Sequence, residues 1–416
     1  MKKAIQRVVS FMLVIIFATS MTVFGVEDAL RNDDIPDLHP DFAELMLRQV
    51  PALEAHEALY QMFTVNDDGT VTYPDDFAGV WIEDSKYLYI AIVTSNLRNM
   101  SAYGSTLAGH EDVVVFVEAA HSLNELTQLR DEVFNMLQEA SLPVVSGFVD
   151  MEGNRVILSL KEFDNADDIR MIDNFNALSL DMSDIIYLET IPAYYFKETE
   201  SQATESQIEP SMLQRTLVGG QRIYVNGVPQ TLGANGSGRF ITSGHWLNQG
   251  DIVRPTAMIG QNGVVERVIF GNGSNGDFAV IRVDSGAGYP IHQSNIIRGG
   301  TNGGNRNITG ITSNAPVGTL VSAFGQASGY VIGTVFSINT TFTASGITIN
   351  GVTSVSLLSG STTFGDSGAP WHTFTGQGNN WNLSGVHTGR DNWTGRVYFT
   401  PTVRFINHFT PLTSPR

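Results

Sequence analysis

Residues 271–283 read Gly-Asn-Gly-Ser-Asn-Gly-Asp-Phe-Ala-Val-Ile-Arg-Val, a glycine- and asparagine-rich turn that runs directly into an apolar strand. Glycine and asparagine favour turns, whereas Phe, Val and Ile favour strands. The same alternation fills the chain from residue 215 onward, with further turns at 235–238 and 302–307. This half therefore predicts an all-β barrel or sandwich. One helix is expected near the C-terminus, capped by Thr400.

The first 25 residues have the three-part pattern of a secretory signal peptide. Three basic residues precede an almost wholly apolar run from Val8 to Ala18, and small residues then lead to a cleavage position after Gly25. A membrane anchor is the alternative, but it needs roughly 17 apolar residues and this run is shorter. We therefore expect a secreted, extracellular protein with no membrane attachment after cleavage.

Charge divides the rest of the chain at residue 214. Up to Gln214 there are 12 Lys and Arg against 36 Asp and Glu, a balance of −24, whereas from Arg215 onward there are 12 Arg against 6 acidic residues, a balance of +6. Opposite signs suggest that the two halves attract one another, although an acidic half can also serve solubility alone. The basic half is too diffusely charged to predict a nucleic-acid surface.

The acidic half mixes helical and strand patterns. Ser122 followed by Glu125 predicts a capping box that opens an amphipathic helix. Strand-like runs on both sides of this helix, around 80–93 and 147–160, suggest two hairpins and a duplicated α+β unit. A polar stretch without apolar periodicity, residues 198–214, predicts an exposed linker that proteases can cut.

Three polar residues of the β-rich half have the types and the order of a serine-hydrolase triad. His245 ends a β-type run at a Gly-His corner, Asp277 opens an apolar strand, and Ser367 lies in Gly-Asp-Ser-Gly-Ala-Pro. A serine nucleophile needs an adjacent imidazole, a carboxylate that orients it, and N–H groups for the oxyanion. The N–H groups of Gly365 and Ser367 would supply the last.

Each motif alone also has a structural interpretation: a surface turn, a half-buried histidine, or a turn-forming aspartate. Their conjunction, in the order His, Asp, Ser within one β-rich segment, favours catalysis. An α/β-hydrolase would show the order Ser, Asp, His. Asp251 and Asp284 compete with Asp277, but both suit surface turns better.

These motifs resemble the streptogrisin and alpha-lytic protease branch of the trypsin-like serine proteases. The similar segments are Leu217–Gly220, Thr242–His245, Asp277–Val280, Gly365–Gly368 and Gly385–Gly389. The resemblance implies two six-stranded antiparallel β-barrels, with His245 and Asp277 from the first and Ser367 from the second.

It further implies a secreted serine endopeptidase made as a zymogen. In that interpretation residues 1–25 are the signal peptide, 26–197 an acidic α+β prosegment, 198–214 the linker and processing region, and 215–416 the protease domain. The prosegment would act as intramolecular chaperone and inhibitor. The alternatives are a catalytically inactive trypsin-like binding module and an esterase or lipase of another fold.

The sequence departs from the family pattern in three places. Trp246 stands where a cysteine usually follows the histidine, Ala369 replaces a glycine after the serine, and no partner for Asp366 can be identified. The resemblance also implies that the strand with His387, Thr388 and Gly389 binds the substrate residue before the cut, where Arg390 would add a positive charge at the rim. The structural alternative is that His387 hydrogen-bonds within the barrel and Arg390 points to solvent. A histidine at this place suggests a preference for Glu, and cleavage after small or apolar residues is the main rival.

Composition excludes several other chemistries. The chain has no cysteine, which removes disulfides, cysteine nucleophiles and thiolate metal sites. The histidines after residue 215 form no His-Glu-x-x-His or comparable cluster, so we expect no metal and no cofactor. The expected partners are protein or peptide substrates and the chain's own prosegment, and the expected state is a monomer.

Overall fold

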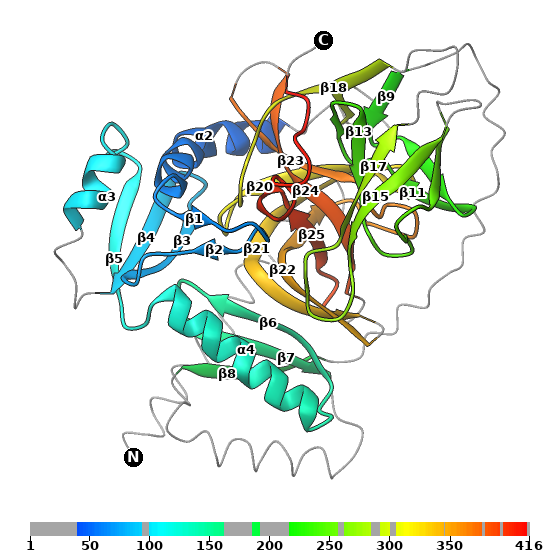
Figure 1. The fold of residues 1–416 in the computed structure, drawn as a ribbon. Helices are drawn as coiled ribbons and strands as arrows, with labels where there is room; N and C mark the ends of the chain where they lie inside the picture. Colours follow the sequence, from blue (N-terminus) through cyan, green and yellow to red (C-terminus); the bar gives the residue numbers. More distant parts are fainter. Residues whose placement is uncertain are drawn as a thin grey trace.

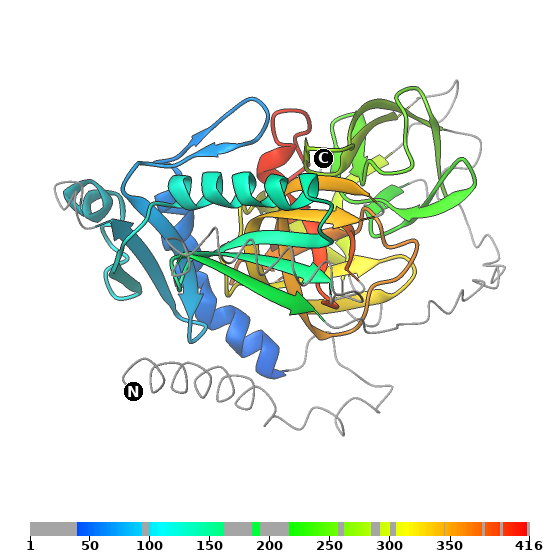
Figure 2. The ribbon, with the colours of Figure 1, turned by 90° about the horizontal axis from the view of Figure 1, so that it is seen from below.

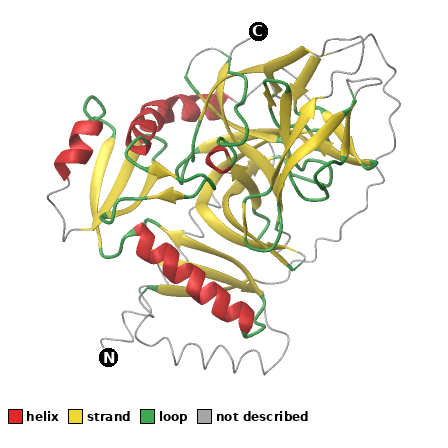
Figure 3. Cartoon of the chain, viewed as in Figure 1, coloured by secondary structure: helices red, strands yellow, loops and turns green. Residues whose placement is uncertain are grey.

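The computed structural model describes residues 40–93, 100–161, 185–191, 216–256, 262–283, 292–299, 305–344, 346–376, 379–391 and 394–413. Most helix lies before residue 192, and the chain after residue 215 is almost wholly strand and loop (Figures 1 and 3). We call residues 40–191 the N-terminal region and residues 216–413 the C-terminal region. The expected signal peptide, the linker 198–214 and Asp284 lie outside the described residues. No described helix is long and apolar enough to span a membrane.

The first half of the C-terminal region is an antiparallel sheet that rolls into a six-stranded barrel. Its strands, in sheet order, are β11 (Val228–Thr231), β10 (Arg222–Val225), β14 (Ile252–Pro255), β15 (Gly263–Ile269), β17 (Phe278–Val283), β13 (Arg239–Thr242) and β12 (Asn235–Gly236). The segment 228–236 runs from β10 to β13 as one strand, because Gly233 N–H donates to Ile241 O at 2.8 Å. This segment closes the barrel around buried Phe240 and Ile281.

The second half forms a closed ring of six antiparallel strands. The strands, in chain order, are β20 (Leu320–Gly325), β21 (Gly329–Ala344), β22 (Ile347–Ser359), β23 (Pro370–Phe374), β24 (Asn380–Arg390) and β25 (Val397–Pro401). Short strands lie beside the barrels: β9 (Thr216–Gly219), β16 (Ser274–Asn275), β18 (His292–Arg298) and β19 (Asn305–Ile311). Two antiparallel barrels are the architecture that the sequence predicts.

The expected C-terminal helix is absent from the described residues, and this prediction was wrong. Residues 397–401 pair with β22 and β24 instead, and only a 3-10 turn, η2 (Thr402–Arg404), follows. Long-range strand pairing overrides the local helix signal here. Thr400 caps no helix, because its hydroxyl accepts the N–H of Asp277 at 2.8 Å.

The N-terminal region is α+β, as the sequence predicts. Its elements are α2 (Pro40–Tyr60), β1 (Thr64–Val65), β2 (Val71–Thr72), β3 (Phe77–Glu83), β4 (Tyr87–Val93), α3 (Met100–Thr106), β5 (Val114–Ala119), α4 (Leu123–Glu139), β6 (Val144–Asp150), β7 (Arg155–Lys161) and β8 (Ile186–Ile191). Two hairpins, β3–β4 and β6–β7, are each followed by a third strand in parallel pairing. The capping box of Ser122 and Glu125 is present at the start of α4.

The N-terminal region docks onto the second barrel through backbone pairing. Strand β6 pairs antiparallel with β21, so that β6, β7 and β8 extend the barrel sheet (Figure 2). Ile82 N–H donates to Val317 O at 2.7 Å. The amide of Gln49, on α2, donates to Gly318 O at 2.8 Å and accepts Leu320 N–H at 2.9 Å. These bonds satisfy edge groups of the barrel that would otherwise need water.

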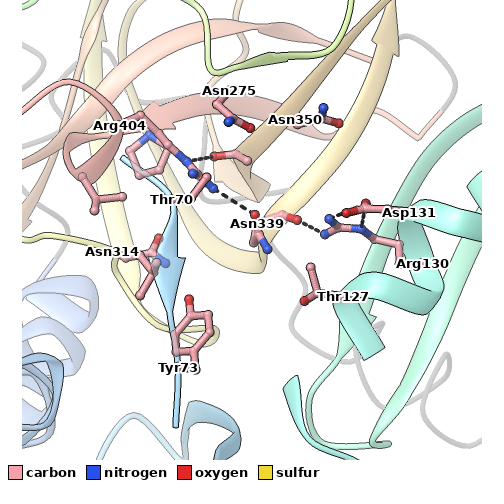
Figure 4. Close-up of a pocket in the computed structure, with 14 residues that line it drawn as sticks. Thr70, Tyr73, Thr127, Arg130, Asp131, Asn275, Asn314, Asn339, Asn350 and Arg404 are labelled. Atoms are coloured by element: carbon pink, nitrogen blue, oxygen red, sulfur yellow. Dashed lines mark hydrogen bonds and ion pairs between the residues drawn. The ribbon is translucent and has the colours of Figure 1, made fainter. Parts of the chain in front are cut away.

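A cavity of about 180 Å³ lies between the two regions, with arginines on both sides (Figure 4). Arg404 donates to Gly69 O at 2.9 Å, to Gly351 O at 3.2 Å and to Asn339 Oδ1 at 2.9 Å. Arg130, on α4, donates to the carbonyl O of the same Asn339. The regions also share apolar packing, because one buried cluster joins Trp81 and Val144 of the N-terminal region to Val321 and Phe399 of the second barrel.

We predict that Gly318→Ala disrupts this docking. Gly318 has φ of +84°, and a Cβ there would overlap the carbonyl O of Ile82. Gly346 has φ of +77° with open space around it, so Gly346→Ala controls for the backbone strain alone. In the full-length chain, urea unfolding should show a loss of about 1 kcal/mol for Gly346→Ala and about 2 kcal/mol more for Gly318→Ala. Equal losses would contradict the docking geometry.

Candidate active site

Three side chains from both barrels meet in one line. His245 follows β13, Asp277 precedes β17, and Ser367 lies between β22 and β23. The Nδ1 atom of His245 is 2.6 Å from Asp277 Oδ2, and its Nε2 atom is 2.8 Å from Ser367 Oγ. Asp277 is fully buried, whereas the other two are partly exposed.

The carboxylate of Asp277 fixes both the ring and the backbone of the histidine. Its Oδ1 atom accepts the N–H groups of Gly244 at 2.7 Å and of His245 at 2.8 Å, and its Oδ2 atom faces the ring. Burial lowers the pKa of His245, but the negative charge of Asp277 and the hydrogen bond to it outweigh burial and raise this pKa above its ordinary value. The carboxylate thus stabilises the protonated ring.

This arrangement prepares the serine for nucleophilic attack. With its proton on Nδ1 facing Asp277, the neutral ring presents the lone pair of Nε2 to Ser367 Oγ. The serine hydroxyl can donate to that lone pair, and its proton can pass to the ring as the oxygen attacks an electrophile. The geometry fits a general-base mechanism.

The loop before the serine is anchored to the first barrel through Thr231. The Thr231 hydroxyl donates to Gly365 O at 2.8 Å, and the Thr231 N–H donates to Ser367 O at 2.9 Å. Gly365 has φ of +100°, which favours glycine. Among the described residues, the N–H groups of Gly365 and Ser367 have no acceptor, so both are available to an oxyanion.

Asp366 has a set of partners that the sequence did not reveal. This buried carboxylate accepts backbone N–H groups of Ala327 at 2.9 Å, Ser328 at 3.0 Å and Thr363 at 2.8 Å. Within the described part of the chain, the hydrogen-bond donors to this carboxylate are therefore backbone N–H groups and not a cationic side chain. Gly325 is the one sequence signal, because a Cβ there would overlap Asp366 Oδ1.

His387 lies on β24 beside the residues that follow Ser367. Its N–H donates to Ala369 O and its carbonyl accepts Gly368 N–H, both at 2.8 Å. The side chain is buried, and its Nδ1 atom accepts Trp371 Nε1–H at 3.4 Å, which places the ring proton on Nε2. Burial lowers the pKa of His387 to about 4, so the ring is neutral near pH 7.

The other expected substrate-binding residues differ in their surroundings. Thr388 is buried, and its hydroxyl lies 3.1 Å from that of Thr400, which in turn bonds to the backbone of Asp277. Gly389 and Arg390 are half-buried at the end of β24. Among the described residues, no group of three or more His, Cys, Asp or Glu side chains is placed to hold a metal ion.

Two large aromatic side chains beside the site are exposed. Trp246 follows His245 and is 70% exposed, and Phe364 precedes Gly365 and is 69% exposed. The ring centroids of Trp246 and His245 are 6.4 Å apart in an edge-on arrangement. Sequence reasoning marked Trp246 only as a departure from the family pattern and did not consider Phe364.

Solved structures of bacterial serine proteases match about half of the chain. Cellulomonas bogoriensis chymotrypsin matches at 22% identity over 48% of this chain and 100% of its own, with a TM-score of 0.39. Nocardiopsis protease (NAPase) matches at 24% identity over 47% and 96%, with a TM-score of 0.39. A glutamic-acid-specific serine protease, whose substrate binding uses a histidine triad, matches at 22% identity over 46% and 96%, with a TM-score of 0.35. No family model and no curated relative matches the chain.

We predict that Asp366→Asn destabilises the protein by about 1–3 kcal/mol, because an amide NH₂ must then face a buried N–H donor. Asp68→Asn is the matched control: Asp68 also accepts a backbone N–H, from Thr70 at 2.9 Å, but is exposed. That change should cost about 0.5 kcal/mol or less. Urea unfolding of the full chain measures both. A cost for Asp366→Asn as small as for the control would show that the three N–H groups do not need the carboxylate.

Proposed function

We propose that this chain is a secreted serine endopeptidase of the trypsin-like class that hydrolyses peptide bonds through an acyl-enzyme on Ser367. One observation carries the proposal: a single imidazole, that of His245, lies 2.6 Å from a fully buried carboxylate and 2.8 Å from a serine hydroxyl. A histidine with only a structural role would not need a buried carboxylate on one ring nitrogen and a serine hydroxyl on the other.

The proposed mechanism assigns one task to each group. Ser367 Oγ attacks the carbonyl carbon of the substrate while His245 Nε2 takes the hydroxyl proton. The N–H groups of Gly365 and Ser367 bind the oxyanion. His245 then gives the proton to the leaving amine, the C–N bond breaks, and a water molecule repeats the sequence to release the acid. Asp277 keeps the ring in the required tautomer throughout.

We further propose that residues 26–197 are a prosegment that guides folding of the protease domain and inhibits it until residues 198–214 are cut. Support comes from the docking of β6 on β21 and from the many non-local strand pairs of the two barrels. Domains dominated by non-local pairs fold slowly, so a surface that binds the second barrel would speed its closure. The protein would act as a monomer without a cofactor.

His387 supports a proposed preference for Glu before the cut. The neutral ring bears its proton on Nε2 and can donate one hydrogen bond to a substrate carboxylate. The backbone bonds of His387 to residues 368 and 369 place it next to the acylated serine. In this proposal Thr388, Gly389 and Arg390 complete the substrate-binding strand. The rival remains cleavage after small or apolar residues.

Replacement of Asp277 by Asn should reduce peptidase activity near pH 7 by about 10⁴-fold. The amide oxygen can keep the N–H groups of Gly244 and His245, so the amide NH₂ must face His245 Nδ1. The ring proton then moves to Nε2. A protonated Nε2 has no lone pair with which to accept the proton of Ser367. Because the carboxylate also raises the pKa of His245, the acid limb of the kcat/KM profile should move to lower pH in this variant.

Asp251→Asn is the control for this test, since Asp251 accepts Asn248 N–H in a polar turn and should leave activity nearly unchanged. Ser367→Ala gives the baseline and should lose about 10⁶-fold in rate. Activity that survives in Ser367→Ala, or an Asp251→Asn variant as slow as Asp277→Asn, would refute the assignment.

A peptide library that varies only the residue before the cut tests the Glu preference between about pH 5 and 9. Cleavage after Glu should exceed that after all other residues. His387→Ala should reduce it by about 10- to 100-fold, the value of a hydrogen bond to a charged group. Stronger cleavage after Phe, Leu or Ala, unchanged by His387→Ala, would rule the preference out.

A further inference from the structure

Trp246 is held in solvent by a strained turn. Its φ of +70° lies in the left-handed region, which bulky residues rarely adopt. Leu247 N–H donates to Gly244 O at 3.1 Å, and this tight turn directs Leu247 into the barrel core and Trp246 outward. Gly or Asn would fit the same turn with less strain. The indole ring therefore needs an explanation other than packing.

The proposed reaction determines which part of the substrate passes Trp246. The acyl part remains bonded to Ser367, beside His387 on β24. The amine part receives its proton from His245 Nε2, so the residue after the cut must lie against the histidine. Trp246 is the next residue in the chain, and its ring stands edge-on to the imidazole at 6.4 Å between centroids.

We propose, on the basis of the proposed function, that Trp246 forms the subsite for the residue after the cut and selects a large apolar or aromatic side chain there. The exposed indole supplies apolar area that such a side chain covers on binding. The turn closed by Leu247 N–H and Gly244 O imposes the φ of +70° and so keeps the indole beside His245 when no substrate is present.

Acyl transfer isolates this subsite from the rest of the enzyme. The processed enzyme is acylated by the methyl ester of the peptide that it cleaves best, and the acyl-enzyme is then divided between water and an added amine. Phenylalaninamide, leucinamide and glycinamide are the amines. Because each ratio is measured on one acyl-enzyme, changes in acylation rate or in the amount of folded enzyme cancel.

The wild-type enzyme should prefer phenylalaninamide over glycinamide by about tenfold, the effect of burying part of one ring. Trp246→Asn, which suits the turn, should reduce the preference to about twofold or less, and Trp246→Phe should retain most of it. Ile252→Asn is the control, because Ile252 is an exposed apolar residue of the same barrel, and it should leave the ratio unchanged.

Two results would overturn the inference, and they are distinguishable. Ester turnover with equal use of the three amines, or the same loss of preference in Ile252→Asn as in Trp246→Asn, would reject the subsite while the endopeptidase stands. No ester turnover by the wild-type enzyme would reject the endopeptidase and the subsite together.

Discussion

The buried carboxylate of Asp277 is the constraint on which the rest of the site depends. It accepts three N–H groups, two from the backbone of the Gly244–His245 corner and one from the imidazole. Its own N–H is bound by Thr400, a residue of the second barrel. Asp277 therefore sets the ring tautomer and holds the Gly244–His245 backbone that carries the ring. Through Thr400 it also connects the first barrel to the second. A fully buried charge is tolerable only with such complete hydrogen bonding.

The packing of the two barrels brings together site residues that are far apart in the sequence. His245 and Ser367 are 122 residues apart, and each lies in a loop next to a strand of its own barrel. Thr231, from the first barrel, binds the carbonyl groups on both sides of the serine turn. The N-terminal region docks on the second barrel, the one that contributes Ser367 and β24.

The sequence predicts the catalytic motifs better than it predicts the hydrogen-bond partners that hold them in place. Catalytic residue types and their order are local features, so His245, Asp277 and Ser367 could be proposed from short stretches, as could the α4 capping box. Two of the three partners of Asp366 are backbone N–H groups 38 and 39 residues away, and backbone groups leave no mark in a sequence. The local context of Thr400 predicts a helix cap. Its pairing in β25 is set by strands distant in sequence.

The most direct test of the account is where an active-site phosphonate reacts. The full-length chain is expressed, residues 198–214 are cut with an added protease, and the product is treated with a fluorophosphonate, digested, and mapped by mass spectrometry. The account predicts one adduct, on Ser367, because only a serine paired with a neutral imidazole is nucleophilic enough. It also predicts that unfolding in urea or His245→Ala abolishes that adduct. No adduct on the folded protein, or labelling of Ser367 that persists in His245→Ala, would contradict the central claim.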